Sequence, residues 1–412
     1  MKRIYFDHNA TTAVEPEVVQ AMLPYFSGEF GNASSIHGFG QKARAAVETA
    51  REQVAGLMGA RAQEIVFTSG GTEADNHAIF GVVRAAIADG VKLSGRAGAK
   101  ELEREHPNRL QSAKSPHVIT TTIEHEAVLN ACQALEKDGI DVTYVDVDGA
   151  GRVDPESIRR ALRTETLLIT VMHANNELGT VQPLEEIGKI AAEADVYFHT
   201  DAVQSVSKIP VDVNLLKLDL LSLSGHKIYA PKGIGALYVR GGTQIRQLMY
   251  GGHHQRGFRP GTENVAGIVG LGKAAEIARG LLASDAARVG QLRDELERGL
   301  LQRVPDARVN GAGAARTPNT TNITFAGIEG EALVIALDLK GLACSTGAAC
   351  SSGAVEPSHV LTAIGLSAEE ARASLRFSLG RHTRPEDVAF AVEAVSGCVE
   401  KLRALSPVYR KN

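Results

Sequence analysis

The stretch Ser224-Gly225-His226-Lys227 lies between two apolar runs, Leu218-Asp219-Leu220-Leu221-Ser222-Leu223 and Ile228-Tyr229-Ala230-Pro231. A lysine in this position is not a typical solvated surface charge. Partial burial disfavours the charged ammonium, lowers its pKa and leaves an amine that can attack a carbonyl carbon. The stretch therefore predicts a strand that leads into a reactive lysine, Lys227.

An aspartate follows another apolar run a short distance upstream, in Phe198-His199-Thr200-Asp201-Ala202-Val203-Gln204. A reactive lysine and an acid suit pyridoxal phosphate (PLP), because the amine can hold the aldehyde while the acid pairs with the pyridinium nitrogen. Lys227 and Asp201 together predict PLP as the cofactor. They do not identify the reaction.

The composition is that of an ordinary globular chain, with 44% hydrophobic and 22% charged residues. Its 412 residues exceed what one core usually supports, so we expect two domains. A net charge of -4 gives no general attraction to nucleic acid or anionic membranes. Residues 1–7 predict a strand rather than a signal peptide, and no apolar run is long enough to span a bilayer. The four cysteines form neither a metal-ligand pattern nor a disulfide framework, which favours the cytoplasm.

Strand-like and helical patterns alternate through the first two-thirds of the chain. Several of the strands are apolar throughout, as strands covered on both faces are. Helical patterns such as 41–57 and 184–194 lie between them. The series predicts an α/β fold with a mostly parallel seven-stranded sheet and helices on both faces. The strand candidates are 64–68, 118–122, 142–145, 167–171, 196–199, 220–222 and 236–239.

Polar residues follow five of these predicted strands. Ligands of parallel sheets bind beyond the carboxyl ends of the strands, so we expect one shared site there. The residues concerned are Thr68-Ser69-Gly70-Gly71, His125, Asn176, Asp201 and Lys227.

After Gly261 the pattern changes to helix-rich sequence, beginning with a helix expected at 265–282 and including a short strand at 322–325. We therefore expect a large cofactor-binding domain over 12–272. Residues 1–11 and 273–412 would form a smaller α+β domain. The polar segment 90–116 has no apolar periodicity and is interpreted as a solvated insertion.

The run Thr68-Ser69-Gly70-Gly71-Thr72-Glu73-Ala74 predicts a strand, a glycine turn and the start of a helix. Free amides at such a start bind phosphate, although the same pattern also caps helices that bind nothing. Ser224 and His226, which flank the reactive lysine, could add phosphate donors.

Three other residues each have two interpretations. His125 could stack on an aromatic cofactor or shuttle protons, but a lone histidine is often structural. Asn176 could donate to the cofactor and to a substrate carboxylate, or it could be a turn residue. Arg376 lies within an apolar strand and needs a partner, which could be a substrate carboxylate or an internal Asp or Glu.

Cys350 lies among small residues in Ser345-Thr346-Gly347-Ala348-Ala349-Cys350-Ser351-Ser352-Gly353. Inert cysteines are usually buried, so a thiol in a small-residue loop is poorly explained as structural. Cys132, Cys344 and Cys398 lie in apolar or helical patterns and are expected to fill the core.

Together these motifs resemble the PLP-dependent cysteine desulfurases of the NifS/IscS family, which have the fold-type I aminotransferase scaffold. The resemblance runs almost from end to end. The Ser-Gly-His-Lys run together with the Cys350 loop is its most specific part, and the loop resembles that of class I members. Two departures are the long 90–116 segment and Ser-Thr-Gly-Ala-Ala-Cys in place of Ser-Ser-Gly-Ser-Ala-Cys. The motifs also include 5–12, 256–264 and 356–361.

The resemblance implies a role for each site residue. Lys227 would anchor PLP and move the α-proton, and Cys350 would take sulfur from L-cysteine as a persulfide and release L-alanine. His125 would stack on the ring, Asp201 would pair with its nitrogen and Gln204 would reach its phenolic oxygen. Asn176 and Arg376 would hold the substrate carboxylate. The phosphate would be held by Gly71, Thr72, Ser224, His226 and, from the neighbouring subunit of a homodimer, Thr262.

Two other functions compete with this one. A fold-type I aminotransferase or selenocysteine lyase would not use Cys350, and a non-catalytic scaffold for sulfur-pathway partners would not bind PLP. The sequence does not name the sulfur acceptor, which could be an iron–sulfur scaffold, a tRNA-thiolation relay or a nitrogenase-dedicated scaffold.

Overall fold

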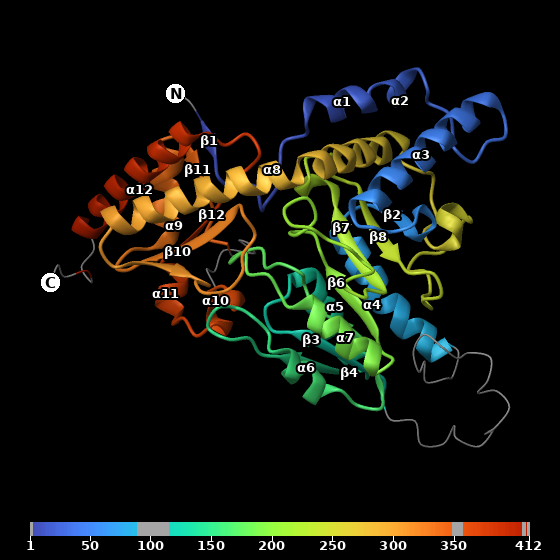
Figure 1. The fold of residues 1–412 in the computed structure, drawn as a ribbon, viewed down its shortest axis with the longest axis horizontal. Helices are drawn as coiled ribbons and strands as arrows, with labels where there is room; N and C mark the ends of the chain where they lie inside the picture. Colours follow the sequence, from blue (N-terminus) through green and yellow to red (C-terminus); the bar gives the residue numbers. More distant parts are fainter. Residues whose placement is uncertain (1–2, 89–114, 348–356, 406–408, 410–412) are drawn as a thin grey trace.

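The computed structural model describes residues 3–88, 115–347, 357–405 and 409. Its largest sheet has seven strands in the order β2-β8-β7-β6-β5-β3-β4, and β8 is antiparallel to both of its neighbours (Figure 1). Each strand overlaps one of the seven predicted ranges, so the predicted sheet is confirmed. The strands are β2 (Ile65–Thr68), β3 (His117–Thr121), β4 (Asp141–Val145), β5 (Thr166–Thr170), β6 (Tyr197–Asp201), β7 (Leu220–Ser224) and β8 (Gly235–Val239).

Helices cover both faces of this sheet, and its central strands are therefore buried at every position. Neighbouring residues of one strand belong to different cores: Leu221 packs on the face of α3, α6, α7 and the first part of α8, and Leu220 on the face of α4 and α5. These helices are α3 (Gly38–Leu57), α4 (Gly71–Ala88), α5 (Glu126–Lys137), α6 (Pro155–Ala161), α7 (Leu184–Glu193) and α8 (Val265–Arg303).

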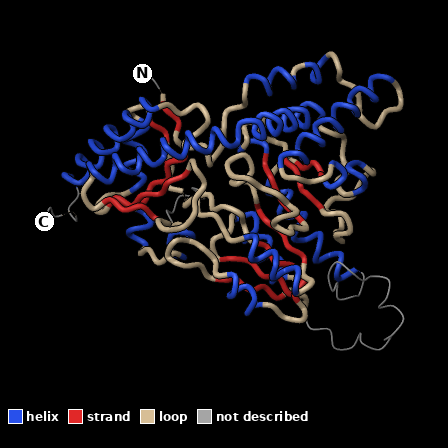
Figure 2. Tube along the Cα trace, in the orientation of Figure 1, coloured by secondary structure: helices blue, strands red, loops and turns tan. Residues whose placement is uncertain are grey.

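A second core lies around two smaller sheets at the other end of the molecule (Figure 2). One sheet has the antiparallel order β12-β10-β9, and in the other β1 pairs in parallel with β11. The second part of α8 packs here with α9 and α12. The elements are β1 (Ile4–Tyr5), β9 (Ala307–Asn310), β10 (Thr320–Phe325), β11 (Leu342–Ala343), β12 (Ser374–Ser378), α9 (Gly330–Asp338) and α12 (Pro385–Leu405).

Short elements complete the described chain. They are α1 (Pro16–Met22), α2 (Pro24–Ser27), α10 (His359–Ala363), α11 (Ala368–Arg372) and the 3₁₀ turns η1 (Ala62–Glu64), η4 (Gly225–Lys227) and η5 (His254–Gly257). In the part of the chain that the structure describes, no helix combines the length and the apolar character that crossing a membrane requires.

Helix α8 is longer than predicted: it has 39 residues and does not end near Leu282. Buried residues from Ile268 to Ala278 pack in the first core and those from Val289 to Leu300 in the second. A helix that packs in two cores changes its buried face along its length. Its apolar residues then do not follow one continuous helical period, so the sequence pattern does not show that it is a single helix. The helix crosses the predicted boundary at 272/273, and the domain limits remain a prediction.

Candidate active site

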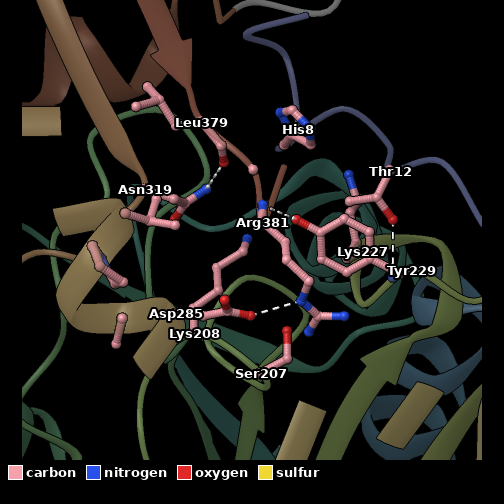
Figure 3. A pocket seen from close by; sticks show the side chains of 14 residues that line it. His8, Thr12, Ser207, Lys208, Lys227, Tyr229, Asp285, Asn319, Leu379 and Arg381 are labelled. Atoms are coloured by element: carbon pink, nitrogen blue, oxygen red, sulfur yellow. Dashed lines mark hydrogen bonds and ion pairs between the residues drawn. The ribbon is translucent and has the colours of Figure 1, made fainter. Parts of the chain in front are cut away.

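The turn that carries Lys227 follows the end of β7 and is held from the N-terminal segment. The Thr12 hydroxyl donates to the carbonyl of His226 (3.0 Å) and accepts from the amide of Tyr229 (2.9 Å) (Figure 3). The Lys227 amine donates to the carbonyl oxygens of Asn9 and, at 2.9 Å, Ala10. Burial lowers the pKa of Lys227 to about 8, with a further contribution from the positive charge of Arg376. The sequence-based expectation of a partly buried amine with a lowered pKa is confirmed, and its reactivity remains a prediction.

Asp201 ends β6, the strand next to β7, and is buried. Its carboxylate accepts from the amide of Val203 at 2.9 Å. Burial raises the pKa of Asp201, and the nearby His125 and Lys227 oppose this rise. A buried carboxyl group of this kind is stabilised in its charged form by a cation, and a pyridinium nitrogen would supply one.

His125 caps the N-terminus of α5, where its Nδ1 accepts from the amide of Ala127 at 3.1 Å. Its ring is exposed although it is close enough to affect the titration of Asp201. The structure thus gives His125 a capping role and leaves the residue exposed. An accessible ring next to Asp201 suits stacking on a flat cofactor.

The start of α4 and the end of β7 lie side by side. A Cβ atom on Gly71 would come within 2.8 Å of Val203 and 3.5 Å of Ser224, and one on Gly70 would lie 3.8 Å from the Ser224 hydroxyl oxygen. Thr72 follows Gly71 in the first turn of α4. The region therefore combines a helix N-terminus, a side-chain hydroxyl and backbone that approaches closely, which are features of phosphate sites.

His226 lies beside this region, and its Nδ1 contacts the hydroxyl of Thr11 at 3.2 Å. Burial, together with the positive charges of Lys227 and Lys232, lowers the pKa of His226 to about 4. A neutral imidazole can still donate one hydrogen bond, so His226 can serve an anion without adding a charge.

Arg376 is 5% exposed and lies in β12, in the smaller sheet. Its guanidinium pairs with Asp7 at 2.7 Å and donates to the carbonyl of Asn176 at 3.1 Å, while its Nε has no hydrogen-bond partner among the described residues. Of the two partners considered for Arg376, the structure shows the internal acidic one, Asp7, and the role of Arg376 in binding a substrate remains a prediction. The Nε is buried, so a second carboxylate, such as that of a substrate, would bind the remaining N–H groups of the two terminal nitrogens.

Asn9 is a contact residue that the sequence analysis did not identify. Its carbonyl oxygen accepts from both Lys227 and Gln204, and its side chain donates to the carbonyl of Asn176 at 3.0 Å. These partners lie far from Asn9 in the chain, so no local pattern shows them. The motif 5–12, to which the resemblance extends, was the available signal.

Three of the four cysteines lie in the described residues, and all three are buried. Burial raises the pKa of Cys132 and of Cys344 to about 12 in each case. Because the thiolate is the nucleophile, these two thiols are poor candidates for chemistry. The prediction that Cys132, Cys344 and Cys398 fill the core is confirmed, while Cys350 lies outside the described residues, as does most of the 90–116 insertion.

Comparison with known proteins gives consistent results. The aminotransferase class-V family matches residues 4–93 and 106–390. The cysteine desulfurase IscS of Dictyoglomus turgidum is 48% identical, with 99% of this chain and 97% of the relative covered. Cysteine desulfurase 1 of Trichormus variabilis is 50% identical, with 99% and 95% covered.

The chain belongs to the cysteine desulfurase family. Solved structures agree with this membership. A NifS-like protein has a TM-score of 0.85 and 34% identity, with 97% of this chain and 100% of that chain covered. A structure described as SspA in complex with cysteine has a TM-score of 0.77 and 38% identity, with 92% and 100% covered.

Desulfurases of this family depend on PLP, and the residues of this chain fit that cofactor. The close approach at Gly71 suits a phosphate, the buried Asp201 has no hydrogen-bonded cation among the described residues, and Lys227 has a lowered pKa. Asp201 ends β6, Lys227 follows the neighbouring strand β7, and Gly71 begins α4 after β2. This agrees with the expectation that the site lies beyond the ends of the strands.

Proposed function

We propose that this protein takes sulfur from L-cysteine, releases L-alanine and carries the sulfur as a persulfide on Cys350. Family membership supports the reaction. The observation that carries the residue assignment is that Lys227 lies close enough to both Asp201 and Arg376 for each of their charges to affect its pKa. An amine, an acid for a ring nitrogen and a guanidinium for a carboxylate are what an amino acid substrate of PLP requires.

PLP would be held at its phosphate by Gly71, Thr72, Ser224 and His226, at its ring by His125 and Asp201 and at its phenolic oxygen by Gln204. When bound, it supplies an electron sink that makes the substrate α-proton acidic and weakens the bond between Cβ and sulfur. Arg376 and Asn176 hold the substrate carboxylate and so fix the orientation of the amino acid.

Lys227 takes the α-proton, for which its lowered pKa is suited because a base works best when its pKa is near the working pH. The Cys350 thiolate then attacks the substrate sulfur. A sulfur–sulfur bond forms, the carbon–sulfur bond breaks, and the electron pair stays with the substrate carbon, which is protonated to the methyl group of alanine. The substrate is reduced and Cys350 is oxidised, so no external oxidant is required.

The persulfide then passes to an acceptor. We propose an acceptor protein such as an iron–sulfur scaffold, and a reducing cytoplasm as the location, because a persulfide relay needs free thiols.

We also propose a homodimer. Large apolar side chains are exposed near α2 and the start of α3: Phe26 is 65% exposed, Phe30 67% and Ile36 91%. Exposed apolar patches of this kind usually mark interaction sites. The segment around η5 is tied to α3, since Arg51 donates to Gln255 at 2.9 Å, and it leads to Thr262, which is exposed. Thr262 would then reach the phosphate in the partner's site.

The reaction is tested by comparing the wild type with Cys350→Ala and, as a matched control, Cys398→Ala. With cysteine and a reducing acceptor thiol, the wild type and the control should form alanine continuously. The Cys350→Ala variant should bind PLP normally but lose sulfur transfer. A Cys350→Ala variant with normal turnover would instead favour an aminotransferase or lyase that does not use this thiol.

A further inference from the structure

Lys208 lies four residues after Gln204 in the same turn segment and contacts it. Its amine donates to the side-chain oxygen of Gln204 at 2.6 Å and to the side-chain oxygen of Asn9 at 3.3 Å. Both acceptors are neutral amide oxygens, so neither contact is an ion pair. Lys208 and Lys227 line the same cavity of about 40 Å³, which has room for water (Figure 3).

The contacts of Gln204 define the orientation of its amide group. The oxygen accepts from Lys208, and the nitrogen donates to the carbonyl of Asn9 at 3.0 Å. A flipped amide would place its oxygen against the Asn9 carbonyl and its nitrogen against the Lys208 amine, which loses both hydrogen bonds. The observed orientation leaves Gln204 with one further N–H group for a ligand.

Asn9 is itself fixed, which makes this arrangement rigid. Its side-chain oxygen accepts from Asn319 at 2.9 Å as well as from Lys208, and its nitrogen donates to Thr320 at 2.9 Å and to Asn176. Lys208 therefore joins Gln204, in the turn after β6, through Asn9 to Asn319 and Thr320 at the start of β10.

We propose that Lys208 is a positioning residue that fixes the Gln204 amide so that its remaining N–H faces the phenolic oxygen of PLP. The inference rests on the proposed role of Gln204 in binding that oxygen. Lys208 itself does not touch the cofactor in this account. It acts through the hydrogen bond to the Gln204 oxygen.

The electrostatics of the site suit this role. Burial lowers the pKa of Lys208 well below its ordinary value, and the positive charges of Lys227 and Arg376 lower it further. A donor on an amide oxygen polarises the amide and strengthens donation from its nitrogen. Stronger donation stabilises the deprotonated phenolic oxygen and thereby lowers the pH at which the absorbance of bound PLP changes.

The test is a spectrophotometric pH titration of the PLP-loaded protein for wild type, Lys208→Met, Gln204→Leu and the double variant. Lys208→Met should move the midpoint of the absorbance change to higher pH by about one unit. Gln204→Leu should move it in the same direction, and the double variant should titrate like Gln204→Leu alone, because Lys208 acts through Gln204. Lys189→Met, an exposed substitution on α7, should titrate like the wild type.

Additive shifts in the double variant, or a Lys208→Met protein that titrates like the wild type, would overturn the inference. If Gln204→Leu leaves the midpoint unchanged, the assigned role of Gln204 is wrong and so is that of Lys208. A wild type that takes up no PLP would instead contradict the proposed function. If Lys208→Met does not fold, Lys208→Leu, which also lacks a hydrogen-bond donor, replaces it and should shift the midpoint in the same direction, and an unchanged midpoint overturns the inference.

Discussion

The carboxylate of Asp7 and the guanidinium of Arg376 form an ion pair of 2.7 Å, although 369 residues separate them in the chain. The pair joins the segment after β1 to β12. It holds one end of the guanidinium, while the Nε has no partner among the described residues. Arg376 is thus oriented before any substrate arrives.

We predict that Arg376→Lys weakens the binding of cysteine. Lysine keeps the charge but loses the planar set of donors, so one charged hydrogen bond to the carboxylate is lost and KM should rise about tenfold or more. Steady-state alanine formation measures this. Arg308→Lys, on β9 with an exposed pair to Glu370 at 3.0 Å, is the matched control and should leave KM unchanged. An unaltered KM in Arg376→Lys would remove Arg376 from the substrate site.

The pH dependence of Lys227 gives a second prediction. Because its pKa is lowered from 10.5 to about 8, the amine becomes neutral, and hence nucleophilic, as the pH rises through about 8. In protein stripped of PLP, a small aldehyde that forms an imine with Lys227 can be trapped by reduction and measured by peptide mass spectrometry. The trapped fraction should increase with pH, with a midpoint near pH 8. Trapping on the exposed Lys189 in the same samples is the internal control and should increase only at higher pH. Equal midpoints for the two lysines would show that Lys227 is an ordinary solvated amine.

Gly71→Ala tests the proposed phosphate site at the start of α4. The added methyl group would meet Val203 at 2.8 Å and crowd Ser224, so the start of α4 must shift and PLP affinity should fall about tenfold or more. Equilibrium binding of PLP to the stripped protein gives the affinity. The control is Gly280→Ala in α8, where a Cβ meets nothing within 4 Å, and it should bind PLP normally and be stabilised by roughly 0.5–1 kcal/mol. Normal PLP affinity in Gly71→Ala would place the phosphate elsewhere.

The proposed dimer is tested at Phe30. The ring of Phe30 packs against Phe39 at 5.6 Å between centroids, yet both side chains are largely exposed. A charge there would be costly in an apolar interface, so Phe30→Glu should convert the dimer to a monomer in light scattering. Leu339→Glu, at the C-terminal end of α9 where the side chain is 77% exposed, should remain a dimer. If the wild type is a monomer, the dimer proposal and the role given to Thr262 both fail.

The sequence predicted the large sheet well because its strands are short apolar runs ended by polar residues. Asp201 and Lys227, for example, lie in or next to strands that pair directly. The same reasoning missed the contacts of Asp7, Asn9 and Lys208. These contacts involve partners that are distant in the chain or hydrogen bonds to neutral amides. Contacts of these two kinds produce no periodic or compositional pattern in the sequence.

The proposed reaction requires that Cys350 accepts the sulfur. Its most direct test adds one equivalent of L-cysteine to the PLP-loaded protein without any acceptor thiol, then measures free alanine and the mass of each cysteine-containing peptide. We predict one alanine per active site and one additional sulfur atom on the peptide that contains Cys350, with Cys132, Cys344 and Cys398 unmodified. Alanine formed without additional sulfur on Cys350 would contradict the account.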